Sequence, residues 1–131
     1  MDVSSHDVLL VGGGGNIRRV DIASGRVTDV AAYPAGTFSS GDLAFVEGRL
    51  VATASAGGTF STDVLVEVDL TSGTSRVLGE TGFGCIWGLA AYGAALYGLT
   101  CGGLIVRIDS RTGAATMFSS STGEFWGAAA R

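Results

Sequence analysis

The chain alternates short apolar runs with glycine- and hydroxyl-rich breaks, and it sustains no apolar stripe with helical spacing. Runs such as Val8–Val11, Ile17–Val20 and Val64–Val68 are short and rich in β-branched side chains. The sequence holds 22 Gly and a single Pro, and turn formers recur roughly every eight to twelve positions. This pattern predicts an all-β protein built from short strands.

One turn motif occurs three times. Asp21-x-x-Ser24-Gly25 returns as Asp69-x-x-Ser72-Gly73 and as Asp109-x-x-Thr112-Gly113, at intervals of 48 and 40 residues. An apolar run precedes each copy and a shorter run follows it, as in a hairpin. Asp or Ser at the start of such a turn can bond the backbone ahead of it, and the final Gly takes a positive φ. The three aspartates are therefore expected to cap turns rather than to act in catalysis.

A second motif recurs at similar intervals to the first. Trp87-Gly88-Leu89-Ala90 and Trp126-Gly127-Ala128-Ala129 share a Trp-Gly pair, and Gly41-Asp42-Leu43-Ala44 holds the corresponding place in the first unit. One unit thus reads strand, turn, strand, loop, strand, Asp turn, strand. Its length of about 40–50 residues is the period expected of a propeller blade.

These motifs resemble β-propeller repeats, above all a bacterial type with an Ile-Asp-x-x-Thr-Gly hairpin, seen in Arg107-Ile108-Asp109 through Gly113. The inner-strand motif Gly88–Ala90 and the strand Leu96–Gly98 belong to the same resemblance. We expect three blade repeats in one domain, over about 8–46, 47–91 and 92–129. The resemblance leaves the activity open, because propellers serve as lectins, enzymes, receptors and scaffolds.

The strand count predicts how the fold is completed. The repeat places three strands in the first unit, four in each of the next two, and one final inner strand around Phe125–Ala129. This makes three four-stranded blades in permuted order, too few to close a ring, since propellers have about 4–8 blades. The last strand of one copy can pair with the first three strands of another. We predict a homodimeric six-bladed propeller; the competing interpretations are a fragment of a longer propeller and half of a hetero-assembly.

Two cysteines lie at the same end of one predicted blade. Cys85 precedes the inner strand and Cys101 follows the next strand, so their loops emerge on the same face of an up-and-down sheet. Their Cα atoms are expected within the bridging range of roughly 4.4–6.8 Å. A disulfide would favour an extracellular or periplasmic location, because such bonds persist in oxidising compartments. Two buried free thiols are the alternative.

The alternating hairpins sort the loops onto two faces. One face carries the Asp turns and tight turns at Gly48 and Gly93, whereas the other carries longer loops rich in Gly, Ser and Thr. Aromatic residues in or beside these longer loops are the candidate ligand-binding residues: Phe38, Phe60, Phe83, Trp87, Phe125 and Trp126. A ring beside hydroxyls and amides suits a sugar or a peptide. For Trp87 and Trp126, which begin inner strands, packing between blades is the favoured interpretation.

The predicted function is a non-catalytic, lectin-like binding module that recognises a glycan or a protein partner through the long-loop face. No catalytic motif is visible, since His6 is the only histidine and the Gly-x-Ser-x-Gly and His-Glu-x-x-His patterns are absent. The alternative is a propeller enzyme or a metal-binding propeller with its site at the mouth of the central channel. Asp42 and Glu124, at or just before inner strands, are the candidate residues for that alternative.

The charge, the hydropathy and the glycine cluster bear on whether nucleic acid, a membrane or a cofactor is an expected partner. The 8 basic and 12 acidic residues give a net charge of −4, and the arginines are scattered, so nucleic acid is not an expected partner. Mean hydropathy is high at +0.42, yet no apolar run approaches the roughly 20 residues of a membrane span. The cluster Gly12–Gly15 fits neither the dinucleotide fingerprint nor the P-loop, and no cofactor is expected.

Overall fold

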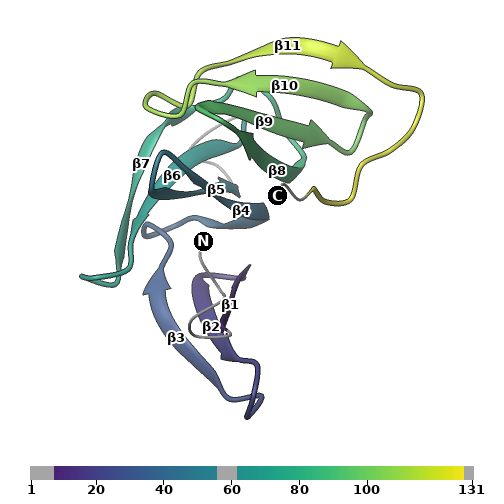
Figure 1. Cartoon of the computed structure of the whole chain (residues 1–131). Coiled ribbons are helices and arrows are strands. Elements are labelled where there is room, and N and C mark those ends of the chain that lie inside the picture. Colours follow the sequence, from purple (N-terminus) through teal and green to yellow (C-terminus); the bar gives the residue numbers. More distant parts are fainter. Residues whose placement is uncertain (1–7, 56–61, 129–131) are drawn as a thin grey trace.

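The computed structural model describes residues 8–55 and 62–128, which are all-β (Figure 1). His6 and Phe60 lie outside these residues. Within them there are eleven strands and no helix, and hence no helix able to cross a membrane. The strands are β1 (Val8–Gly13), β2 (Asn16–Asp21), β3 (Val27–Ala32), β4 (Phe38–Val46), β5 (Arg49–Ser55), β6 (Val64–Asp69), β7 (Thr74–Glu80), β8 (Ile86–Tyr92), β9 (Ala95–Thr100), β10 (Leu104–Ile108) and β11 (Ala115–Ser120).

The strands form three antiparallel sheets, each in chain order: β1 to β3, β4 to β7 and β8 to β11. In Figure 1 the sheets follow one another in an open arc, with the second sheet between the other two. β4 contacts β1 on one side and β8 on the other. Each sequence repeat therefore supplies the last three strands of one sheet. The first two repeats also supply the first strand of the next sheet.

The two ends of the chain differ from the sequence-based prediction. β1 continues through Gly13, two residues beyond the apolar run Val8–Val11, so that only Gly14 and Gly15 lie in the turn. Residues 125–128 form no strand in the single chain, although a strand was predicted around Phe125–Ala129. A strand needs a neighbouring edge for its backbone hydrogen bonds. No strand of the described chain pairs with this segment.

The three Asp turns form as predicted. The Asp Oδ1 accepts one backbone N–H hydrogen bond in the first turn and two in each of the others, at 2.8 to 3.3 Å, from residues two or three positions further on. The bonds hold the pKa of the Asp21, Asp69 and Asp109 carboxyls below its ordinary value. The glycine that ends each turn has a φ between 73° and 83°, a region that favours glycine. Turn capping thus accounts for the repeated aspartates.

The core consists of two apolar clusters, one between each pair of neighbouring sheets. The alternation along β5 shows how they divide: Leu50 belongs to the first cluster and Val51 to the second, because successive side chains of a strand point to opposite faces. Ile17 contributes from the first sheet and Leu96 from the third. The second sheet is therefore buried on both faces, whereas the outer faces of the other two are covered by no sheet of the described chain.

A charged contact ties the second sheet to the third. Arg49 forms an ion pair of 2.8 Å with Glu67 and also donates to the Oγ of Ser110, 3.0 Å away in the β10–β11 turn. Glu67 bonds Arg76 as well, at 2.8 Å. Hydrogen bonds from Arg49 and then Arg76 hold the pKa of the Glu67 carboxyl below its ordinary value. These contacts fix the two sheets against each other away from the apolar cluster.

Gly41→Ala is expected to lower the free energy of unfolding by about 1–3 kcal/mol, the usual effect of overpacking. A Cβ at this position of β4 would lie 2.4 Å from the carbonyl oxygen of Ile86 and 2.8 Å from the Cα of Trp87, so the backbone of β8 would have to move. Urea denaturation followed by circular dichroism measures the change. Gly84→Ala is the matched control, because a Cβ there meets nothing within 4 Å. Equal stability of the two variants would contradict the close packing of β4 on β8.

Candidate functional site

The antiparallel order of the strands sorts their connections onto two faces. One face carries the three Asp turns and the tight turns at Gly48 and Gly93. The other, here called the long-loop face, carries residues 33–37, 81–85 and 101–103, and the chain leaves β11 on the same side. The C-terminal segment, residues 121–128, then returns to the inside of the arc, where it lies against β4 and β8.

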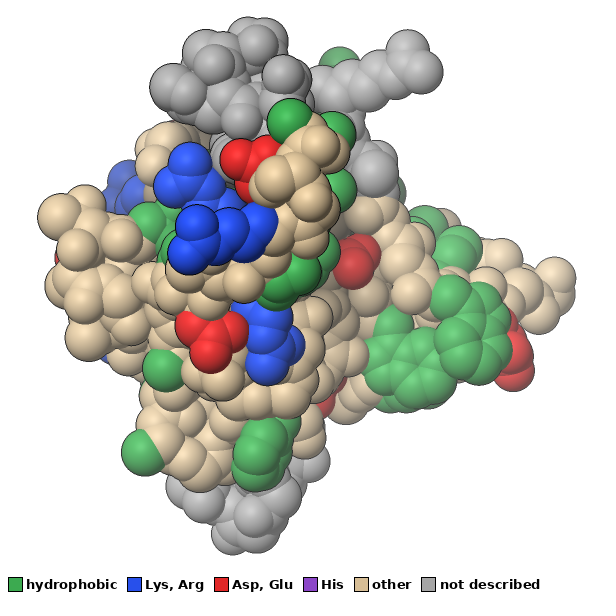
Figure 2. Space-filling view, turned by 90° about the horizontal axis from the view of Figure 1, so that it is seen from below, with side chains coloured by type: hydrophobic (Ala, Val, Ile, Leu, Met, Phe, Trp, Pro, Cys, Tyr) green, Lys and Arg blue, Asp and Glu red, His purple; other side chains and the backbone are tan. Residues whose placement is uncertain are grey.

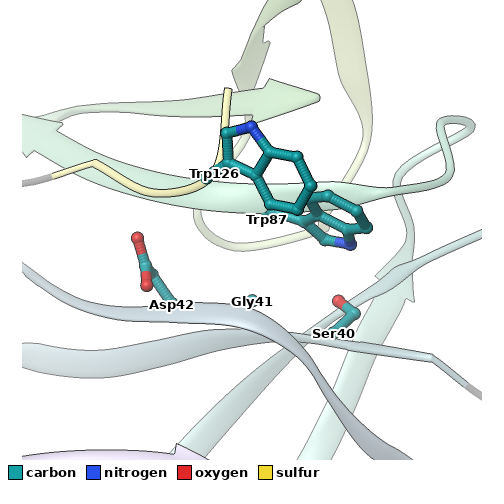
Figure 3. Close-up of a pocket in the computed structure, with 5 residues that line it drawn as sticks. All are labelled: Ser40, Gly41, Asp42, Trp87 and Trp126. Atoms are coloured by element: carbon teal, nitrogen blue, oxygen red, sulfur yellow. The ribbon is translucent and has the colours of Figure 1, made fainter. Parts of the chain in front are cut away.

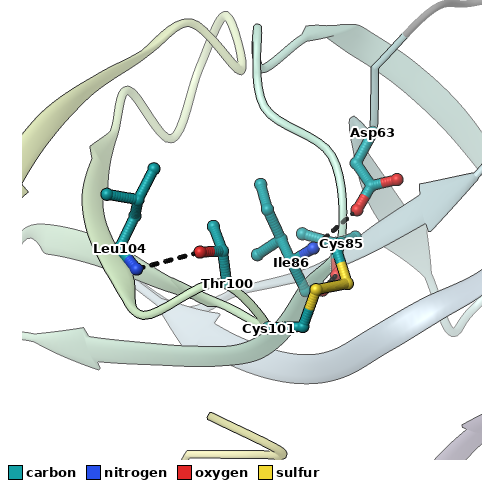
Figure 4. The surroundings of a disulfide bond; sticks show 7 residues. Asp63, Cys85, Ile86, Thr100, Cys101 and Leu104 are labelled. Carbon is teal, nitrogen blue, oxygen red and sulfur yellow. Dashed lines mark hydrogen bonds between the residues drawn. A yellow bond between two sulfur atoms is a disulfide. The ribbon is translucent and has the colours of Figure 1, made fainter. Parts of the chain in front are cut away.

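A disulfide joins two loops of the long-loop face (Figure 4). Cys85 and Cys101 are bridged with a Cα–Cα distance of 5.6 Å, within the predicted range. The Cys101 N–H also donates to the carbonyl of Cys85 at 2.9 Å. Cys85 has a φ of 60°, which few non-glycine residues adopt. The bridge thus fixes the entry to β8 in a defined conformation.

A buried carboxylate holds the start of β8 from the neighbouring sheet. The Oδ2 of Asp63, whose residue is only 6% exposed, accepts the Ile86 N–H at 2.8 Å (Figure 4). Burial raises the pKa of this carboxyl, and the hydrogen bond from Ile86 opposes the rise. The carbonyl oxygen of Asp63 accepts from the hydroxyl of the buried Thr81 at 2.7 Å. Asp63 and the disulfide together position the residue that follows, Trp87.

Two indoles form one wall of an open pocket at the inside of the arc. The ring centroids of Trp87 and Trp126 are 4.8 Å apart and their planes are inclined by 39°. Trp126 is 73% exposed, whereas Trp87 is half-buried. In Figure 3 Ser40 and Asp42 extend from β4 toward these rings, with Gly41 between them. The pocket has a volume of about 320 Å³ and combines apolar ring faces with the Asp42 carboxylate, whereas the Oγ of Ser40 is buried.

Asp42 also holds the C-terminal segment in place. Its Oδ2 accepts the backbone N–H of Ala128 at 2.9 Å, across 86 positions of the sequence. Gly88 of β8 is packed on the same segment, because a Cβ there would lie 3.0 Å from the carbonyl carbon of Gly127 and 3.2 Å from the Cβ of Ala128. The segment that carries Trp126 is therefore anchored to two inner strands.

The structure separates the aromatic residues that the sequence grouped together. Trp87 and Trp126 meet in the pocket, and Phe38 at the start of β4 is 57% exposed. Phe83 packs against the second core cluster, and Phe125 is half-buried. Figure 2 shows a further property of the surface, with hydrophobic side chains gathered in patches between charged ones.

Sequence reasoning missed Ser40 and Gly41 as parts of this pocket. The available signal was the second repeat motif, in which Gly41-Asp42 takes the place of Trp87-Gly88. At that place β4 carries no ring, and the resulting gap opposite the indoles is the pocket. Asp42 was considered only as a metal ligand or channel carboxylate, whereas it bonds the backbone of Ala128.

The described residues offer no cluster of metal ligands at the site. Among the described residues, no three His, Cys, Asp or Glu side chains lie close enough together to hold a metal ion. Glu124 is exposed on the C-terminal segment. What the arrangement offers instead is an aromatic platform with hydrogen-bonding groups at its edge.

The sequence matches no protein-family model and no curated protein. Several solved structures share the fold. In a crystal structure of the mitotic checkpoint complex the similar region has a TM-score of 0.63 and 18% identity, over 93% of this chain and 36% of that chain. A puromycin-hydrolysing peptidase of Mycobacterium tuberculosis gives a TM-score of 0.58 and 22% identity, over 86% of this chain and 19% of that one.

An oligogalacturonate lyase in complex with manganese gives a TM-score of 0.57 and 18% identity, over 87% of this chain and 38% of that one. These neighbours are β-propeller-type folds, and three antiparallel sheets in an arc are what such blades look like. The chain therefore has a propeller-type fold. It spans less than two fifths of each of the three chains named here, and at these identities the likeness concerns the fold alone.

Proposed function

We propose that the protein is a non-catalytic binding module that recognises a glycan at the Trp87–Trp126 pocket, which lies at the inside of the arc beside the long-loop face. The observation that supports this most directly is the exposed indole of Trp126, inclined over Trp87 in a pocket that the Asp42 carboxylate of β4 also lines. An indole face covers the apolar face of a sugar ring. The Asp42 carboxylate accepts hydrogen bonds from sugar hydroxyls.

The lining favours a neutral, hydroxyl-rich ligand over a charged one. The five residues that line the pocket include one carboxylate, Asp42, and no basic side chain, and the net charge of the whole chain is −4. An anionic ligand would thus meet repulsion without a compensating cation. A peptide or protein partner bound at the same pocket is the competing ligand class.

Trp126→Ala is expected to weaken glycan binding at least about tenfold. A Trp at the centre of a binding site commonly contributes about 2 kcal/mol, and 1.4 kcal/mol corresponds to tenfold in Kd. A glycan array identifies the ligand, and isothermal titration then gives the Kd of each variant. Tyr92→Ala is the matched control, because Tyr92 is 82% exposed but ends β8 on the opposite face. Silence across the array, or equal loss in both variants, would contradict the proposal.

We further propose that the binding module is a homodimer, in which two chains complete a six-bladed ring. The support is the open arc of three sheets, whose outer faces carry large exposed apolar side chains such as Leu9 (44%), Val27 (56%) and Phe118 (60%). Exposed apolar surface of this kind is typical of interaction sites. Light scattering tests the assembly: a mass of twice the 13.2 kDa chain is expected, and a stable monomer would refute it.

The disulfide supports an extracellular or periplasmic location for this module. Bridges such as Cys85–Cys101 form and persist where the environment is oxidising. Such a location also suits recognition of surface glycans.

A further inference from the structure

Among the strands of residues 8–55 and 62–128, the first sheet has no counterpart of the strand that begins each of the other two. The third strand of every four-stranded blade carries a bulge where it pairs with the fourth, at Leu65/Val66 in β6 and at Ile105/Val106 in β10. The same bulge falls at Ile17/Arg18 in β2. This equivalence makes β1 the counterpart of β5 and β9, the second strands. In the described residues β1 pairs only with β2, so its other edge is open.

A pocket of about 240 Å³ lies along this open edge. Its walls are the middle of β1 (Leu10 to Gly12), the middle of β4 (Gly41 to Leu43) and Ala128. In the second and third sheets the first strand runs beside the second strand and next to the inner strand of the neighbouring sheet. The pocket thus occupies the place of the absent first strand.

The C-terminal segment complements this open edge. It packs on β8 as the first strand of a further sheet would, but it pairs with no strand of the described chain. Gly41 of β4 packs on the backbone of β8 at Ile86 and Trp87. Gly88 of β8 packs in the same manner on Gly127 and Ala128. The segment therefore lies beside β8, and its last described residue, Ala128, also reaches the pocket beside β1.

We propose that the C-terminal segment of a second copy of this chain fills the pocket and pairs antiparallel with β1, with Gly127 opposite Gly12 and Ala128 opposite Val11. The register follows from the equivalent pairs. In the third sheet Gly88 lies opposite Leu99 and Leu89 opposite Gly98, and in the second sheet Leu43 lies opposite Ala52. This inference rests on the proposed homodimer and specifies its interface.

The side chains of this register face the correct way for a closed ring. Leu10 packs against the core between the first two sheets, so Val11, its neighbour in the strand, lies on the outer face, where it is 39% exposed. Leu89, the counterpart of Ala128, faces the preceding sheet. In the ring Val11 and Ala128 of the two copies therefore lie on the same face of the completed sheet, toward the third sheet of the second copy.

The surface that would cover this face is also apolar. On the third sheet Leu96 and Val106 point inward to the second sheet. Tyr97 lies on the other face and contacts Phe118 edge-on, with ring centroids 5.3 Å apart. In the proposed ring the aromatic outer face of the third sheet of one copy thus meets the aliphatic outer face of the first sheet of the other copy. The two-fold arrangement makes the two contacts of this kind identical.

Cysteine cross-linking tests the register. A Val11→Cys chain and an Ala128→Cys chain are co-expressed with the native bridge intact and then oxidised. Directly opposite residues of an antiparallel pair have Cα atoms about 4.5–5.5 Å apart, within disulfide range. A disulfide-linked dimer is expected, with peptide mapping showing the bond between positions 11 and 128. Leu10→Cys with Ala128→Cys is the matched control and is expected to stay unlinked, because position 10 faces away.

The outcomes separate this interface from the proposals on which it rests. Light scattering could show a dimer in which the cysteine at position 11 forms no more disulfide with position 128 than the cysteine at position 10 does. That result would overturn the register, whereas the proposed homodimer would still hold. A single chain carrying both Val11→Cys and Ala128→Cys that links only within itself would overturn pairing between copies. If a variant fails to fold, hydrogen exchange on the unaltered chain decides: slow exchange of the β1 edge amides in the dimer supports the pairing, and fast exchange refutes it.

Discussion

A chain that ends at Glu124 is expected to run as a monomer or aggregate, whereas the full chain is expected to run as the proposed dimer. The truncation removes Trp126, Gly127 and Ala128, which are the residues packed on Trp87 and Gly88 and bonded to Asp42. Without these residues, no C-terminal segment of a second copy is left to form the proposed pairing with the open edge of β1. An uncovered edge beside apolar side chains such as Leu9 is prone to unspecific pairing.

Size-exclusion chromatography with light scattering measures this loss. A chain that lacks only Arg131 is the control, because it keeps every residue of the repeat motif Trp126 to Ala129 and is expected to remain a dimer. The interpretation would be refuted if the chain ending at Glu124 kept the full dimer mass. Loss of the dimer in both truncated chains would instead indicate a general sensitivity of the C-terminus.

Replacement of both cysteines by serine is expected to lower the free energy of unfolding by about 3 kcal/mol, the value for a loop of about 15 residues in the chain-entropy model. Cys85 and Cys101 are 16 positions apart, and the loop between them contains β8 and β9. The unfolded chain gains freedom when this loop is opened. The native entry to β8, where Cys85 has a φ of 60°, loses its cross-link.

Chemical denaturation with and without reductant measures the effect. The native chain should lose stability when the reductant is added, whereas the Cys85→Ser/Cys101→Ser variant should be insensitive to it. Fluorescence of Trp87, two positions from Cys85, should report the same transition. Equal midpoints for the native chain in both conditions would show that the bridge contributes nothing to the folded state.

Much of the fold was predictable because it depends on neighbouring residues. The Asp turns follow from local chemistry: a carboxylate reaches backbone amides two or three positions ahead, and glycine closes the loop. The disulfide was predictable for a related reason. Once hairpins alternate, Cys85 and Cys101 must emerge on the same face, and their Cα distance of 5.6 Å follows from two adjacent strands.

The candidate site was predictable only in part. Phe38 and Phe83 both stand at long loops in the sequence, yet Phe38 is 57% exposed and Phe83 packs against the core. Their difference depends on how neighbouring sheets approach each other, which no repeat motif records. The last strand was a further limit, because residues 125–128 have the sequence of an inner strand but pair with no strand of the described chain.

The sequence by itself therefore determined the strands β2 to β11, the Asp turns and the placing of the two cysteines on one face, since each rests on spacing along the chain or on strand alternation. Only the tertiary structure decided that Trp126 lies against Trp87 and that Asp42 bonds Ala128. The first contact joins residues that are 39 positions apart in the sequence, and the second joins residues that are 86 positions apart. They depend on the angle between sheets and on side-chain packing inside the arc, and neither has a signature in the order of residues.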